Sequence, residues 1–260
     1  MPPKKAGSKR TARSKPALPQ VGSRTSEADL SALISGHGPR DWKREISLSS
    51  LSTHLGAEKP VNMIVLAADI RRSTFLMKEA VNFKTFATII GDFVEAARDA
   101  MRGARGWFDK FTGDGFLGYW LYGERELGTY ISILFRTCHS LLYHFQEVVM
   151  DQLRRNSKNF PTGVGLSLGI DGGPGHLVTV ARDLTVVGAP VVGAVRMVSS
   201  ALLPWETLCN VYLGEALYRA RGQLQREEIE VLKEFRQTKE YEQEVYRIVF
   251  HKSLGAIRVD

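Results

Sequence analysis

The chain has 260 residues, 43% of them hydrophobic, which suits one folded domain or at most two. Its formal net charge of +7 is typical of nucleic-acid-binding proteins, but residues 1–25 carry seven basic residues and no acidic one. Removing those seven from the 35 basic residues leaves 28, which equals the number of acidic residues. The charge therefore belongs to a tail, and the neutral remainder disfavours a nucleic-acid-binding core.

Residues 1–25 are rich in Pro, Ser, Gly and Lys and have no apolar period, so we expect a disordered basic tail. Such a tail is a solubilising extension or makes weak contacts with nucleic acid or an anionic surface. The tail lacks the apolar region of a signal peptide, and no run of ~18 apolar residues predicts a membrane span. Cys138 and Cys209 lack metal or redox spacing, which favours reduced, buried thiols in a cytoplasmic protein.

The hydrophobic pattern divides the chain into a short helix and linker arm over 26–60, a folded domain over 61–250 and a C-terminal tail over 251–260. Within the domain, strand-like and helix-like segments alternate, with short helical segments between the last two strands. This order predicts an α/β domain with a mixed sheet flanked by helices. The expected strands are 61–69, the hairpin 107–120, 162–171, 176–181 and 184–187 on either side of a turn at 172–175, 207–213 and 243–250; the expected helices are 79–102, 124–154 and 189–203.

Two acidic positions are the strongest candidates for chemistry. Asp69 ends an apolar strand, and Asp114 precedes Gly115 at the tip of the predicted hairpin. Side by side in one sheet, the two carboxylates could share divalent metal ions, as phosphoryl transfer from a nucleotide requires. Taken singly, Asp69 could be a helix cap and Asp114 a simple turn residue.

Four segments in the same order resemble the class III nucleotidyl cyclases, the adenylate and guanylate cyclase family, over about Val61 to Phe250. They are Asp69-Ile70-x-x-x-Thr74, Lys110-Phe111-Thr112-Gly113-Asp114, Thr185-Val186-Val187-Gly188, and the helix from Gly188 to Arg196-Met197. The resemblance implies an α+β fold with a ferredoxin-like or palm-like mixed sheet flanked by helices. It also implies a homodimer whose active sites lie at the subunit interface.

The resemblance further implies a role for each site residue. Two Mg²⁺ or Mn²⁺ ions per active site would be held by the carboxylates and by the carbonyl oxygen of Ile70. The loop after Ile70 would contact the phosphates, and Arg196 would stabilise the transition state. The implied positions are Asp69, Ile70 and Asp114 for metal, Lys110 and Thr185 for the base, Arg72, Ser73 and Thr74 for phosphate, and Lys239, with Arg236 as an alternative, for the triphosphate.

Two positions depart from the family pattern on the last predicted helix. Val192 stands where the family usually has a ribose-orienting Asn four residues before the Arg, and Ala189 replaces the usual Asp after Gly188. Ribose placement is therefore expected to differ from that of the family.

The first 60 residues of the domain resemble a narrower group, the bacterial pyrimidine cyclases of Pycsar anti-phage systems. The resemblance lies in Ala67–Thr74, Lys78–Phe83 and Gly106–Gly115. It implies synthesis of cyclic UMP or cyclic CMP as an infection signal for a separate effector. Lys110 can only donate hydrogen bonds, which suits uracil O4, yet bacterial adenylate cyclases also use a Lys and Thr pair. We therefore favour UTP over CTP and ATP, with a catalytically silent cyclase-like binding or dimerisation module as the other alternative.

Overall fold

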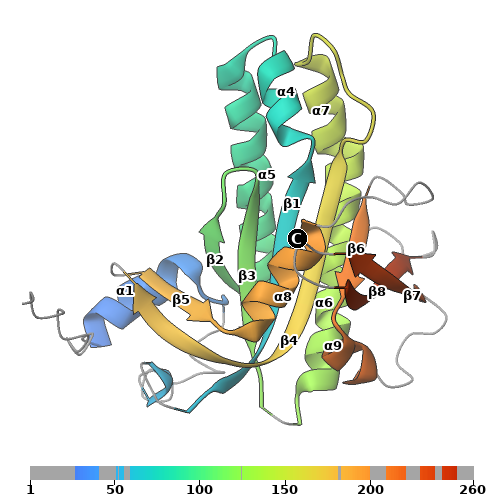
Figure 1. Ribbon diagram of the computed structural model, residues 1–260. Coiled ribbons are helices and arrows are strands. Elements are labelled where there is room, and N and C mark those ends of the chain that lie inside the picture. The colour runs from blue at the N-terminus through green and yellow to red at the C-terminus, as the bar shows by residue number, and fades with distance from the viewer. Residues whose placement is uncertain are drawn as a thin grey trace, which may run out of the picture.

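The computed structural model describes residues 27–40, 51, 53–55, 59–123, 125–180, 183–199, 209–220, 229–237 and 242–250. Within these ranges, none of the helices combines the length and the apolar run that crossing a bilayer requires. The strands form one mixed sheet in the order β2-β3-β1-β4-β6-β8-β7, with β5 paired to β4 (Figure 1). All neighbours run antiparallel except β4 and β6.

The predicted mixed α+β architecture is confirmed, and the central strands are long. The strands are β1 Val61–Arg71, β2 Trp107–Phe111, β3 Gly115–Leu121, β4 Gly165–Val180, β5 Asp183–Val187, β6 Asn210–Leu213, β7 Ile229–Gln237 and β8 Glu242–Phe250. The helices are α1 Glu27–His37, α4 Ser73–Glu79, α5 Phe83–Gly103, α6 Leu127–His144, α7 Met150–Arg155, α8 Ala189–Val198 and α9 Glu215–Ala220, with a π-helical turn Phe145–Val149 joining α6 to α7.

The two faces of the sheet are covered by different helices, because β1 alternates its apolar side chains between two cores. Ile64 and Leu66 join the larger core, under α5 and α6. Met63 and Val65 join a second core, which includes Ala194 of α8. In Figure 1, α8 crosses in front of β1 and β4 while α5 and α6 lie behind them.

Three expected elements differ in the structure. The expected turn at 172–175 is wrong, because β4 continues through these residues as one strand. Its glycines leave room for large neighbouring side chains. A Cβ at Gly172, for example, would lie 2.4 Å from the Leu217 side chain. The expected helix over 79–102 begins only at Phe83, where Asn82 caps it by accepting a bond from the Thr85 amide, and the separate helix α4 precedes it. The segment 229–237 is strand β7 and not helical.

The N-terminal arm packs against the domain rather than extending from it. Ile34 and Leu51 are about 1% exposed and belong to the same core as Met63 and Val65. Arg102 of α5 donates to the carbonyl oxygens of Gly38 and Ser35, at 3.2 and 3.3 Å. Helix α1 also contacts β2, the strand that carries Lys110.

Candidate active site

The sheet brings the two candidate metal carboxylates together. Asp69 of β1 lies directly opposite Gly115 of β3, and Asp114 is the residue before Gly115. The Ile70 amide donates to the Asp114 carbonyl oxygen at 3.0 Å, which ties the hairpin tip to β1. A Cβ at Gly115 would lie 1.9 Å from the Ala68 carbonyl oxygen, so only glycine permits this close approach.

The electrostatics of this pair indicate a place for positive charge. Burial, and after it the nearby Asp114 carboxylate, raise the pKa of Asp69, while Arg71 lowers it; together they bring this pKa to about 6. Asp114 accepts a hydrogen bond from the Ser73 hydroxyl at 2.6 Å. A divalent cation between the two carboxylates would relieve the repulsion that raises the Asp69 pKa.

The donor set fits a magnesium or manganese ion. Over the described ranges, no cluster of three or more His, Cys, Asp or Glu side chains is found, so this site has two carboxylates. The Ile70 side chain is 1% exposed and lies in the core, which leaves its backbone carbonyl as the part of Ile70 that could bind a metal. Two carboxylates with the remaining positions left to water and phosphate are the usual way that proteins bind Mg²⁺.

The residues after Ile70 are divided between the sheet and the surface. Arg71 reaches across the sheet and donates from Nε to the buried Ser167 hydroxyl at 2.7 Å and from Nη2 to the Tyr212 hydroxyl at 3.4 Å. Arg72 is exposed and left-handed, with φ 65°, at the start of α4, and Thr74 is exposed on that helix. The predicted phosphate-contacting residues therefore separate: Ser73 faces Asp114, whereas Arg72 and Thr74 remain at the surface.

The predicted base-selecting residues also meet. The Lys110 ammonium on β2 donates to the Thr185 hydroxyl on β5 at 3.2 Å. It also lies 3.4 Å from the carboxylate of Asp109, whose side chain is only 2% exposed. Asp109 was not among the predicted site residues. The sequence does carry a sign of its burial. Asp109 is two residues after Trp107, and in a regular strand both side chains would face the core.

Helix α8 carries Arg196 along the same face of the sheet as Asp69. It lies so close to β4 that a Cβ at Gly169 would be 2.3 Å from the Ala194 carbonyl oxygen. Arg196 is half-buried, and Arg71 is a cation that lowers the pKa of Asp69. Val192 is 47% exposed, so this helix presents an apolar side chain where the family usually has Asn.

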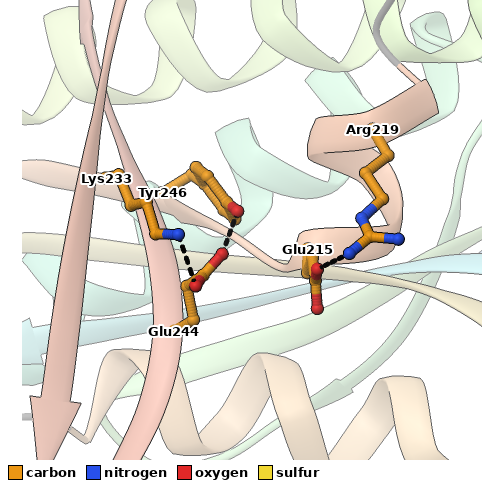
Figure 2. Close-up of polar contacts among 5 residues, drawn as sticks. All are labelled: Glu215, Arg219, Lys233, Glu244 and Tyr246. Atoms are coloured by element: carbon orange, nitrogen blue, oxygen red, sulfur yellow. Dashed lines mark hydrogen bonds and ion pairs between the residues drawn. The ribbon is translucent and has the colours of Figure 1, made fainter.

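The predicted late triphosphate-binding positions are Lys239 and, as an alternative, Arg236. Lys239 lies outside the described residues, and the described part of Arg236 is its backbone. Lys233 is held by Glu244 at 2.7 Å, and Glu244 also accepts from the Tyr246 hydroxyl (Figure 2). Figure 2 also shows the Glu215–Arg219 ion pair on α9. The ion pair between Lys233 and Glu244 joins β7 to β8 at the surface.

The fold is shared with cyclase domains of known structure. No protein-family model matches the chain, and no curated protein matches it. The adenylyl cyclase CyaB from P. aeruginosa aligns with a TM-score of 0.61 at 17% identity, over 75% of this chain and 97% of that one. The guanylyl cyclase Cya2 gives 0.57 at 17% identity, over 75% and 96%. The guanylyl cyclase domain of the RhoGC fusion protein from the aquatic fungus Blastocladiella emersonii gives 0.56 at 12%, over 75% and 100%. The chain thus has the fold of a class III nucleotidyl cyclase domain.

Proposed function

We propose that this protein is a metal-dependent nucleotidyl cyclase that converts a nucleoside triphosphate into its 3′,5′-cyclic nucleotide and pyrophosphate. The observation that carries this proposal is the pair of carboxylates on adjacent strands, Asp69 and Asp114, whose mutual repulsion helps to raise the pKa of Asp69. A fold whose purpose was only packing would gain nothing from placing two acids together.

The reaction joins the 3′-oxygen of the ribose to the α-phosphorus and breaks the bond from that phosphorus to the bridging oxygen of pyrophosphate. When bound, divalent ions would supply Lewis-acid activation of the 3′-hydroxyl and charge neutralisation at the phosphates. Asp69, Asp114 and the Ile70 carbonyl would hold them, and Ser73 would orient the Asp114 carboxylate. Arg196 would donate to the oxygens on the pentavalent phosphorus, where negative charge develops.

The active sites would be completed by a second subunit. In one chain, the carboxylate pair joins β1 to the tip of the β2–β3 hairpin, and the Lys110–Thr185 contact joins β2 to β5. A symmetric homodimer would place Arg196 of one subunit beside the metal carboxylates of the other, giving two equivalent sites. Val192 and Val195, 47% and 40% exposed on α8, provide apolar surface suited to such an interface.

UTP is the substrate that we favour, with cyclic UMP as a messenger in bacterial anti-phage defence acting on a separate effector. The support is the Pycsar-like sequence and the half-exposed Lys110, which offers only donors to the base. CTP and then ATP are the alternatives. Both bases carry an exocyclic amine, from which the Thr185 hydroxyl could accept a hydrogen bond.

The test is incubation of the full chain with ATP, GTP, CTP and UTP plus manganese, followed by mass spectrometry of the products. We expect cyclic UMP to form fastest, as judged by kcat/KM, with no product from the Asp69→Asn control. A preference for CTP or ATP would replace the substrate and keep the enzyme class. The absence of any cyclic product from all four nucleotides would leave a silent binding or dimerisation module.

A further inference from the structure

Asp109 occupies an irregular position in strand β2. The pairing of β2 with β3 shifts between Phe108 and Lys110, so that Asp109 and Lys110 together oppose Leu117. This is the arrangement of a β-bulge, which changes the face to which the following side chain points. Trp107 pairs with Tyr119 and Lys110 pairs with Leu117, and both partners belong to the core on the α8 side. The bulge therefore turns Asp109 and Lys110 toward the same face, on which β5 presents Thr185.

The Asp109 carboxylate is buried and poorly satisfied. Among the described residues, neither of its oxygens accepts a well-formed hydrogen bond, and its side chain is 2% exposed. Burial raises the pKa of Asp109, whereas the nearby Thr185, Lys110 and His37 lower it. The nearest cation is the Lys110 ammonium at 3.4 Å, and a buried carboxylate that lost it would be left uncompensated.

Lys110 lies between this carboxylate and the solvent. Its side chain is 51% exposed, and the ammonium group that contacts Asp109 also donates to Thr185 at 3.2 Å. A nucleotide base can thus reach Lys110 but not Asp109. Each of the three side chains lies beside the other two, with Asp109 buried and Lys110 half-exposed.

We propose that Asp109 is a positioning residue for base selection: its buried carboxylate holds the Lys110 ammonium against the Thr185 hydroxyl and so fixes the donor that the base meets. The inference rests on the proposed cyclase function. It applies to whichever base the protein prefers, because it concerns where Lys110 is held. A flexible lysine would adapt to several bases, whereas a fixed one rejects a base whose edge leaves a buried polar group unpaired.

The first test is the substrate preference of Asp109→Asn, an isosteric change that removes the charge. We expect the ratio of kcat/KM for the best nucleotide to that for the next best to fall about tenfold, mostly through a higher KM for the best one. Adding Asp109→Asn to Lys110→Met should change that ratio by less than about twofold, because the positioned group is already absent. Asp99→Asn, an exposed acid on α5, is the control. An unchanged ratio in Asp109→Asn, or additive effects in the double variant, would overturn the inference.

The second test does not depend on turnover. At pH 8, Lys110→Met should lower the melting temperature, because it strands the buried carboxylate, and Asp109→Asn/Lys110→Met should melt higher than Lys110→Met alone. If the double variant melts at the temperature expected from adding the two single effects, Asp109 does not hold Lys110. If wild type makes no cyclic nucleotide but the melting coupling is present, the cyclase proposal fails and the Asp109–Lys110 contact stands.

Discussion

The hairpin β2–β3 carries two ionic clusters of opposite design. At its tip, Asp114 joins Asp69 in a like-charge pair, and the second carboxylate raises the pKa of the first. Lower on the same hairpin, Asp109 joins Lys110 in an opposite-charge pair that the chain completes by itself. The first cluster repels itself until a cation arrives, whereas the second is neutral without any ligand.

The like-charge pair is suited to binding a metal cation, whereas the opposite-charge pair exposes a cation of its own, the Lys110 ammonium. Removing a member of the like-charge pair relieves repulsion, so it should abolish function without harming the fold. Removing Lys110 from the opposite-charge pair strands the buried Asp109 carboxylate, so it should harm both function and fold. The variants of Asp109 and Lys110 described above test the second half of this contrast, and the predictions below test the first.

The largest effect is expected from Asp69→Asn and Asp114→Asn, which should each abolish cyclisation. Each amide removes one of the two negative charges that would hold the ions. The measurement is cyclic nucleotide formation at saturating manganese, with Asp99→Asn as the exposed control. Appreciable turnover by either variant would remove that residue from the metal site.

The next largest effect is expected from Arg196→Ala, which should cost on the order of 10² to 10³ in kcat, as for loss of one transition-state donor. The shared-site dimer adds a second outcome: mixing Asp69→Asn with Arg196→Ala should restore activity. Random exchange gives about half heterodimers, each with one intact and one doubly damaged site, so recovery should approach about a quarter of wild type. If the subunits exchange and no activity returns, Arg196 does not act in trans.

A smaller effect is expected from Ser73→Ala, because the Ser73 hydroxyl donates to Asp114 at 2.6 Å and does not itself bind the ion. Groups that orient a metal ligand typically contribute about 10- to 100-fold in metal affinity. The manganese concentration for half-maximal rate should therefore rise about tenfold, with the rate at saturation nearly preserved. A fall in the saturated rate with no change in manganese requirement would place Ser73 on the substrate instead, as its position in the sequence motif first suggested.

The carboxylate pair could be predicted from the sequence, because a strand end and a hairpin tip mark its two positions, whereas Lys110 and Thr185 were paired only through the resemblance to the cyclase family. Asp109 could not be assigned, because its contact with Lys110 depends on a bulge that turns Lys110 to the same face and that no local pattern marks. The long strand β4 was also missed, because Gly172–Gly175 read as a turn until tertiary packing required small residues there. The packing of Ile34 and Leu51 against the core likewise depends on contacts distant in the sequence.

The stability of Asp69→Asn gives a still smaller effect that reports directly on the repulsion. Since the folded pKa of Asp69 is raised to about 6 from 3.8, the folded state retains a proton that the unfolded chain releases between those values. Wild-type stability from this group therefore falls as pH rises through that window and stays reduced above it. In metal-free buffer, Asp69→Asn should match wild type near pH 4 and melt about 2–4 °C higher at pH 8, for about 1 kcal/mol. Manganese should raise the melting temperature of wild type and leave that of Asp69→Asn nearly unchanged. A variant that melts lower than wild type at pH 8 would show that the carboxylate pair does not repel.

The smallest effect is expected from deleting residues 1–25, which hold the excess positive charge of the chain but belong to neither cluster. The segment has no apolar face with which to dock, so turnover of free nucleotide should stay within about twofold of wild type. Binding of nonspecific DNA, if the full chain shows any, should weaken with salt and disappear with the deletion, since the remainder is formally neutral. A large fall in kcat would instead mean that the tail completes a site. In that case the basic tail would supply part of the positive charge that the Asp69–Asp114 pair lacks, and this pair would no longer depend on a bound cation alone.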